Sequence, residues 1–208
     1  MTLRILSVIL LLMLVGCAQH PKKPVQMPTK QVQKGASLDE RYNSHVKNIS
    51  ANQNWQAQGR LAASNGNKGG NASFVWTQKG ESYQIKLFGP FGSGSVYITG
   101  HPTFVELKEA NGKTTRAQTP ESLLKKVAGW QVPLTGLRYW MRGIPAPSAA
   151  PNSQKIAQNG VLERLVQQGW HIDYENYQES SPLLPSKLRL QNGNIKVKMI
   201  VTEWTVLK

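Results

Sequence analysis

Apolar and polar residues alternate in short runs along most of the chain from Trp55 onward, and turn-forming residues separate the runs. Six such runs follow one another as far as Gln118, joined by connections of only a few residues. A period of two is typical of half-buried β-strands, and short connections favour antiparallel pairing of successive strands. Asn111-Gly112 and Asn192-Gly193 lie between alternating runs, and this dipeptide strongly favours a hairpin turn. The pattern therefore predicts a mainly β fold with a large antiparallel sheet.

The runs resume near Val161, after a loop at residues 144–151 that is rich in proline and alanine, and they predict ten or eleven strands. Residues 64–71 are rich in glycine and asparagine, so we expect a turn there. Lys196 and Lys198 alternate with apolar side chains, which predicts one wet and one buried face for that strand. A sheet of this size either fills its interior with its own side chains or encloses a cavity, and the alternation is compatible with both.

Helical spacing interrupts the strand pattern between residues 119 and 143. Thr119 followed by Pro120 is typical of a helix start, and Gly129 ends this first helix. A second helix is predicted from Pro133 to Gly143. We expect these helices, near residues 120–143, to form a lid over one end of a curved sheet, although ordinary core-covering helices fit the pattern as well. Their apolar positions are Leu123, Leu124, Val127, Trp130, Leu137, Trp140 and Met141.

Residues 37–49 predict another helix at the start of the domain. Ser37 with Glu40 three residues later is a capping-box pattern. His45 stands among polar residues and is expected to face solvent. The apolar face of this helix consists of Leu38, Tyr42, Val46 and Ile49.

The N-terminus has the features of a bacterial lipoprotein signal. Arg4 precedes an apolar run that is too short to span a bilayer, and residues 14–17 (LVGC) resemble the lipobox. The lipobox implies cleavage after Gly16 and covalent S-diacylglycerol and N-acyl groups on Cys17, with no other cofactor expected. Ala18 after the cysteine favours sorting to the outer membrane. We therefore expect a signal peptide at residues 1–16, a lipidated cysteine and flexible basic tether at residues 17–37, and a single β-barrel domain at residues 38–208.

The connection Gly89-Pro90-Phe91-Gly92 joins two of the predicted strands. Glycine and proline explain a turn, but they do not explain a phenylalanine at a tip that is normally polar. Phe91 is therefore a candidate for insertion into a membrane or an apolar partner. The alternative is that its ring folds back and covers an edge of the core.

The formal net charge is +14, from 25 basic and 11 acidic residues. The excess is spread along the chain, since the first 54 residues carry seven basic and two acidic groups and the remainder carries eighteen and nine. Spread positive charge suits lipid headgroups or an acidic protein, and a solvated basic surface without a partner is an equally compatible interpretation. Nucleic acid is not expected as a partner of an exported lipoprotein.

No grouping of residues in the sequence suits catalysis or a metal ion. The four histidines are scattered, and no nucleophile, phosphate-binding or dinucleotide motif is present. His171 and Asp173 are two residues apart on one predicted strand, where a polar pair on one face is the simpler interpretation. The tryptophan and methionine content instead fits a deformable apolar pocket, with Trp76 and Trp204 among its candidates, although each of these residues could equally be simple core. We therefore expect a protein that is not an enzyme.

Taken together, these parts resemble the LolB family of outer-membrane lipoproteins. The most specific segments are the loop at residues 89–93 (GPFGS) and residues 137–145 (LRYWMRGIP), and the strand at residues 195–199 (IKVKM) followed by Trp204 also matches. The resemblance covers the whole chain. It implies an incompletely closed antiparallel barrel of about eleven strands with a short-helix lid over an apolar cavity for acyl chains. The residues expected at this cavity and lid are Trp76, Leu123, Leu124, Val127, Leu137, Trp140, Met141 and Trp204.

The resemblance also implies a function. Proteins of this family receive lipoproteins from the periplasmic carrier LolA by binding their acyl chains, and insert them into the inner leaflet of the outer membrane. They are expected to be monomers, lipid-anchored to the outer membrane and facing the periplasm. The family carries an exposed leucine on its protruding loop, and Phe91 is the matching position here. The alternative function is that of a lipid-anchored periplasmic binding or scaffold module for another amphiphile.

Overall fold

The structure is a computed structural model that describes residues 35–89, 94–129 and 131–207. Over these residues it contains three helices and eleven strands, and from Ala36 onward they belong to one compact unit. Several predicted features lie outside the described residues, namely the signal peptide, most of the tether, Cys17, Pro90, Phe91, Gly92 and Trp130.

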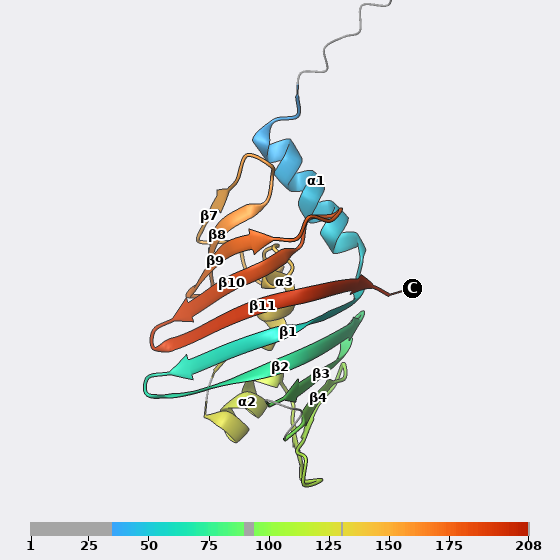
Figure 1. Ribbon diagram of the computed structural model, residues 1–208, viewed down its shortest axis with the longest axis vertical. Coiled ribbons are helices and arrows are strands. Elements are labelled where there is room, and N and C mark those ends of the chain that lie inside the picture. Colours follow the sequence, from blue (N-terminus) through green and yellow to red (C-terminus); the bar gives the residue numbers. More distant parts are fainter. Residues whose placement is uncertain (1–34, 90–93, 130, 208) are drawn as a thin grey trace, which may run out of the picture. The chain divides into compact units, whose positions relative to one another are not determined.

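The strands form a single antiparallel sheet (Figure 1). They are β1 (Asn54–Asn65), β2 (Lys68–Lys79), β3 (Ser82–Phe88), β4 (Val96–Gly100), β5 (Val105–Lys108), β6 (Thr114–Ala117), β7 (Ser153–Ile156), β8 (Leu162–Gln167), β9 (Trp170–Tyr177), β10 (Pro185–Asn192) and β11 (Ile195–Val206). Their order is β6-β5-β4-β3-β2-β1-β11-β10-β9-β8-β7. The two edge strands, β6 and β7, do not pair with each other in the described chain, so the predicted incomplete closure of the sheet is confirmed.

The turn between β1 and β2 consists of only two residues, Gly66 and Asn67. The turn predicted over residues 64–71 is therefore too long, because both strands continue in register as far as this turn. β1 pairs with both β2 and β11. This pairing keeps the segment in strand conformation despite the low strand propensity of its glycine and asparagine residues. At Gly69 an added Cβ would lie 2.9 Å from the carbonyl oxygen of Ala63, so glycine is required for this close approach.

The centre of the sheet bends where the register between β1 and β11 shifts at Gly59. A Cβ at Gly59 would overlap the carbonyl oxygen of Ile200 on β11. Next to the shift, the hydroxyl of Thr202 donates to the carbonyl oxygen of Gln58 at 3.1 Å. A bulge of this kind increases the local twist of a sheet, which helps the long central strands to curve around the inner face.

The three helices are α1 (Leu38–Ala51), α2 (Pro120–Ala128) and α3 (Leu134–Trp140). Ser37 and Glu40 form the predicted capping box at α1, and Thr119 caps α2 by accepting from the backbone of Ser122. The prediction that His45 faces solvent is wrong, because its side chain is half-buried and its Nε2 atom is buried without a hydrogen-bond partner among the described residues. No helix in the described ranges has both the length and the apolar character needed to cross a membrane.

Inward-facing side chains of the sheet form one core cluster with side chains of all three helices. α2 and α3 lie on the same side of the sheet (Figure 1) and contribute Leu123, Leu137 and Trp140 to this cluster. Aromatic rings are prominent in it, and the ring centroids of Trp55 and Trp76 lie 5.7 Å apart. The opposite, outer face of the sheet carries polar and charged side chains at the alternate positions.

Candidate functional site

A groove opens where α3, the β2–β3 turn, α1 and the loop at residues 144–151 meet, and we call it the α3 groove. Its volume is about 470 Å³. A concave site with mostly apolar walls and a few polar groups suits an apolar ligand. The apolar residues in its wall include Val46, Trp55, Tyr139, Ile144, Pro145 and Ala146.

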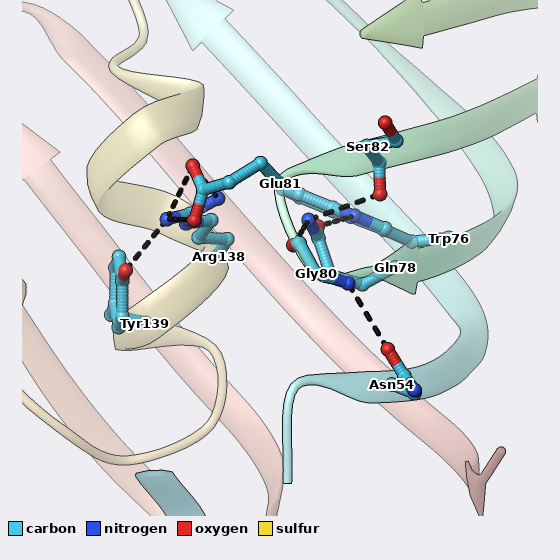
Figure 2. A network of polar contacts seen from close by, with 8 residues as sticks. All are labelled: Asn54, Trp76, Gln78, Gly80, Glu81, Ser82, Arg138 and Tyr139. Atoms are coloured by element: carbon cyan, nitrogen blue, oxygen red, sulfur yellow. Dashed lines mark hydrogen bonds and ion pairs between the residues drawn. The ribbon is translucent and has the colours of Figure 1, made fainter. Parts of the chain in front are cut away.

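The β2–β3 turn beside this groove is held in place by a chain of hydrogen bonds (Figure 2). Gln78 is only 2% exposed; it accepts from the indole N–H of Trp76 at 3.0 Å and donates to the carbonyl oxygen of Gly80 at 2.7 Å. The backbone N–H of Gly80 in turn donates to the side-chain oxygen of Asn54 at 3.1 Å. These bonds fix the turn so that Glu81 extends toward α3 (Figure 2).

An ion pair joins this turn to α3. Arg138 donates to the carboxylate of Glu81 at 3.1 Å and 3.4 Å, and to the hydroxyl oxygen of Tyr139 at 2.6 Å (Figure 2). Burial alone would lower the pKa of Arg138, but the hydrogen bonds with Glu81 and Tyr139 outweigh burial, and the pKa lies above its ordinary value. The side chain of Glu81 is 70% exposed, so water competes for this ion pair and its strength is modest.

The C-terminal end of α3 is anchored by polar bonds inside the protein. The indole N–H of Trp140 donates to the side-chain oxygen of Gln167 at 2.6 Å, and the hydroxyl of Tyr174 donates to the carbonyl oxygen of Trp140 at 2.9 Å. Gln167 also exchanges two hydrogen bonds with the backbone of Ala146, at 2.9 Å and 2.8 Å. α3 is therefore fixed to β8 and β9 at its end, and linked to the β2–β3 turn by an exposed ion pair.

Arg142 is a buried cation at the base of the α3 groove. Its Nη2 atom donates to the carbonyl oxygens of Ile49 and, at 2.6 Å, of Asn52, where α1 ends. The guanidinium lies 5.6 Å from the ring centroid of Trp55. Burial lowers the pKa of Arg142 to about 10, so the side chain stays charged at neutral pH. A second groove, of about 220 Å³, lies beside the first, and Arg142 and Trp55 line both.

Most of the residues expected at the acyl-chain cavity lie together in the core. Leu124 is half-buried and packs against this core, and Trp204 lines the second groove. In the structure these side chains pack against one another, so an acyl chain can enter among them only if they move apart. Five of the expected residues are at most 6% exposed: Trp76, Leu123, Leu137, Trp140 and Met141.

Val127, on the predicted lid helix α2, differs from these residues because it does not pack into this core. It is 39% exposed, whereas Leu123, one turn earlier on the same face of α2, has no exposed surface. All residues from 125 to 129 are exposed, so only the first half of this nine-residue helix packs against the protein. Of the expected membrane-insertion loop, Gly89 is described and is half-buried at the end of β3, while Pro90, Phe91 and Gly92 lie outside the described residues.

Sequence reasoning did not foresee the roles of Trp55, Arg138 and Arg142 at the α3 groove. The available signal is a pair of arginines four residues apart within the apolar segment 137–145, because a charged residue in such a segment is seldom buried without a specific partner. No group of three or more potential metal ligands occurs within the ranges that the structure describes. The chemistry of the site is therefore that of an apolar groove bordered by two guanidinium groups.

Comparison of the sequence with known proteins identifies the family of this chain. Residues 53–204 match the family model described as outer membrane lipoprotein LolB. Relatives named outer-membrane lipoprotein LolB include that of Alkalilimnicola ehrlichii, which is 34% identical over 94% of this chain and 92% of its own length. The relative from Cellvibrio japonicus is 32% identical over 83% of this chain and 87% of its own length. That of Francisella tularensis subsp. novicida is 30% identical over 97% of this chain and 93% of its own length.

Solved structures share the fold at much lower sequence identity. A LolA superfamily protein from Nitrosomonas europaea superposes with a TM-score of 0.54 at 8% identity, covering 80% of this chain and 94% of that one. A DUF1329 family protein from Desulfovibrio piger gives a TM-score of 0.51 at 7% identity, covering 80% of this chain and 91% of that one. These structures share the fold, and the match of residues 53–204 with the family model, together with the relatives at 30–34% identity, shows that the chain belongs to the LolB family of outer-membrane lipoproteins.

Proposed function

We propose that the protein accepts lipoproteins from the periplasmic carrier LolA by binding their acyl chains, and inserts them into the outer membrane. Membership of the LolB family makes it an outer-membrane lipoprotein. The observation that carries the proposal is the apolar α3 groove, which opens beside an aromatic and aliphatic core covered by a short helix. This arrangement suits the uptake of acyl chains better than that of a polar ligand.

In this proposal acyl chains enter through the α3 groove and then separate the core side chains beneath α3. The Glu81–Arg138 ion pair is exposed and modest in strength, so the side of α3 that borders the groove is the easier one to release. Met141, at the end of α3, offers a polarisable surface that can repack around a flexible chain. The buried hydrogen bonds of Gln167 would hold the C-terminal end of α3 in place while the part of α3 that borders the groove moves.

The transfer needs no nucleotide because the acyl chains exchange one apolar environment for another. Each buried methylene contributes about 0.8 kcal/mol in the carrier, in this protein and in the bilayer alike. The difference between successive sites is therefore small compared with the cost of exposing whole acyl chains to water. Direct contact between carrier and acceptor, and then between acceptor and bilayer, is what the physical chemistry requires.

We further propose that acyl groups on Cys17 anchor the protein and that Phe91 probes the bilayer. Several acyl chains on one residue give a stable anchor, and the segment at residues 17–37 is long enough to act as a tether. Phe91 follows β3 by three residues, where the family carries its exposed leucine. Burial of a phenylalanine side chain in lipid is worth about 1.5–3 kcal/mol, which is sufficient for a transient probe.

The experiment that tests this function is the transfer of a fluorescent lipoprotein from its complex with purified LolA to the full-length protein in vesicles. We expect rapid transfer to the protein, followed by insertion of the cargo into the vesicle. Phe91→Glu should leave the first step intact and block the second, while Phe91→Leu, the matched control, should support both. Binding of a fluorescent fatty acid without uptake of lipoprotein from LolA would contradict the proposal and favour a carrier of another amphiphile.

A further inference from the structure

The outer face of the sheet has a groove that the proposed function does not use, and we call it the outer-face groove. Its volume is about 670 Å³, and its lining comes from β9, β10, β11 and the β1–β2 hairpin. Lys196 and Lys198, the two lysines of the IKVKM segment, line it together with Arg189, His171 and one acidic residue, Asp173. Small residues of the β1–β2 hairpin leave the groove open on the other side.

Strand register aligns cations across this face. Lys155 stands opposite Arg164 on β8, and Arg189 stands opposite Lys198 on β11. Asp173 is the one acidic residue of this row and lies between Arg164 and Arg189. Like charges directly opposite each other destabilise a sheet. Lys155, Arg164 and Arg189 of this row each have a carboxylate partner, so Lys198 is the cation of the row on which an anionic ligand would act.

Carboxylates neutralise only part of this face. Among the described residues, no carboxylate lies within ion-pair distance of Arg60, Lys196 or Lys198, all of which are exposed. Lys196 and Lys198 beside the groove are thus left without an ion-pair partner among the described residues, whereas Arg189 pairs with Glu175. The ion pairs that do form on this face are Lys155–Glu163, Arg164–Asp173, Lys187–Glu175 and Arg189–Glu175.

The outer-face groove lies at the level where the connection between β3 and β4 begins. One row of paired residues crosses four neighbouring strands at this level. It runs from Phe88, the last residue of β3, through Ser73 on β2 and Arg60 on β1 to Ile200 on β11. β3 runs antiparallel to β2, so at Phe88 it heads toward the β1–β2 turn. The groove residues of β2 and β11, such as Lys198, lie beyond this row in the same direction.

Aromatic and aliphatic side chains accompany the cations at this level. The Nζ atom of Lys86 lies 5.4 Å from the ring centroid of Phe88 and 5.6 Å from that of Tyr97. Ile200, in the row that starts at Phe88, is 42% exposed. Aromatic rings and lysines with their stems along apolar surface are typical of the zone where a protein meets lipid headgroups. This combination fits a lipid surface better than an acidic polypeptide.

We propose that the outer-face groove binds the phosphate groups of anionic phospholipids, and that this end of the outer face lies against the bilayer. Lys196 and Lys198 are the donors, since each ammonium group has three N–H bonds and no internal carboxylate partner. The proposal rests on the proposed function only in assuming that the protein works beside a bilayer. It adds to that function an orientation of the domain, set by lipid charge.

The experiment compares two labelled positions on the outer face of the full-length protein, reconstituted in vesicles through its own anchor. Gln191→Cys places an environment-sensitive fluorophore beside the groove, and Thr205→Cys places it near the opposite end of the same face; both residues are exposed. The unsubstituted chain measures any labelling at Cys17, the only native cysteine. Vesicles contain phosphatidylcholine alone or with phosphatidylglycerol, and a headgroup spin label serves as quencher.

With phosphatidylglycerol present, we expect quenching at position 191 to exceed that at position 205 by about twofold or more, and added salt should reduce the difference. Lys196→Gln combined with Lys198→Gln should abolish the difference. The matched control removes the same charge from exposed lysines away from the groove, Lys47→Gln with Lys79→Gln, and should retain it. Circular dichroism should show that both double variants are folded.

Equal quenching at the two positions, or quenching that is unaffected by Lys196→Gln with Lys198→Gln, would overturn the proposal. Protection of the label at position 191 by added LolA, without any effect of phosphatidylglycerol, would also overturn it and assign the groove to an acidic protein. Lipoprotein transfer is measured separately with the same variants. Failure of transfer in a protein that still shows lipid-dependent quenching would count against the proposed function and leave this inference standing.

Discussion

Gln167 is a polar residue without exposed surface, and it uses its amide group entirely inside the protein. Its oxygen accepts from Trp140 and from the backbone of Ala146, and its nitrogen donates to the carbonyl oxygens of Ala146 and Ala149. A single side chain thus joins β8, the end of α3 and the loop at residues 144–151. A buried network of this kind is strong only while each of its groups has a partner.

We predict that Gln167→Met destabilises the protein by at least about 2 kcal/mol, because the indole N–H of Trp140 and the backbone N–H of Ala146 lose their acceptor in a buried place. Urea unfolding followed by tryptophan fluorescence measures this loss. Gln84→Met is the control, since Gln84 is exposed on β3, and it should change the stability by no more than about 0.5 kcal/mol. Similar stabilities of the two variants would show that the network contributes little.

At the scale of single residues, the sequence predicts well which side chains are buried. It predicts less well which residues those side chains contact. Helical spacing correctly predicts burial of Leu123, Leu137 and Trp140, because apolar side chains at that spacing share one face. The same spacing fails at Val127, since it does not show where the packing surface ends. The partners of Arg142 lie on α1, far away in sequence, and no local pattern encodes them.

In the proposed function, uptake of an acyl chain depends on α3, and one exposed ion pair links this helix to the β2–β3 turn. We predict that Glu81→Gln weakens this link by up to about 1 kcal/mol and speeds the entry of a fluorescent fatty acid up to roughly fivefold. Stopped-flow fluorescence measures the rate. Glu106→Gln breaks a comparable exposed pair with Arg116, at 2.6 Å between β5 and β6, and should leave the rate unchanged. Equal rates in all three proteins would mean that α3 does not control entry.

We predict that the protein loses stability in acid because of His45 on α1. Burial lowers the pKa of His45 in the folded protein, so below its ordinary pKa of about 6.5 the unfolded chain binds a proton that the folded chain resists. The contribution of His45 to stability is therefore intact above that pH and decreases as the pH falls toward the folded-state pKa. One proton limits the slope to about 1.4 kcal/mol per pH unit.

Urea unfolding of the wild type and of His45→Gln, measured from neutral pH down to about pH 5, tests this prediction. The wild type should lose more stability than the variant over that range, and the two should behave alike above neutrality. The comparison cancels the carboxylates that titrate in both proteins. Equal losses of stability with falling pH in the two proteins would show that the burial of His45 does not make the stability depend on its protonation.

Elements with a clear local pattern could be predicted, and those without one could not. The capping box of α1 and the Thr119-Pro120 start of α2 indicate where these helices begin, and both are found in the structure. β7 (Ser153–Ile156) escapes prediction because it contains one apolar residue and is mostly exposed, as an edge strand can be. The β1–β2 hairpin is longer than predicted because pairing with β11 imposes strand structure on a segment of low propensity.

For the whole molecule, a net charge of +14 sets how it meets charged partners. We predict that the rate of lipoprotein transfer from LolA decreases roughly tenfold between low and high ionic strength, because salt screens long-range attraction to an acidic carrier surface. Stopped-flow transfer at several salt concentrations measures this effect. Uptake of the same lipoprotein from uncharged detergent micelles is the control and should change little. A transfer rate independent of salt would contradict electrostatic steering.

The class of the fold could be predicted from the sequence, but the order of its strands could not. Alternation is a local property, so it indicates strands, turns and antiparallel neighbours within each half of the chain. The central pairing of β1 with β11 joins the beginning and the end of the domain, for example Trp55 with Val206. A pairing between such distant segments leaves no mark on either of them, and only the structure shows it.

The central position of β1 and β11 also imposes an order on events in time. β1 is synthesised and exported among the first parts of the domain, while its partner β11 (Ile195–Val206) is the last of the described strands in chain order. Until then one long edge of β1 has no permanent neighbour and is open to pairing with strands of other molecules. The hazard of aggregation therefore extends over the whole passage of the chain into the periplasm, and it ends only when the last strand arrives.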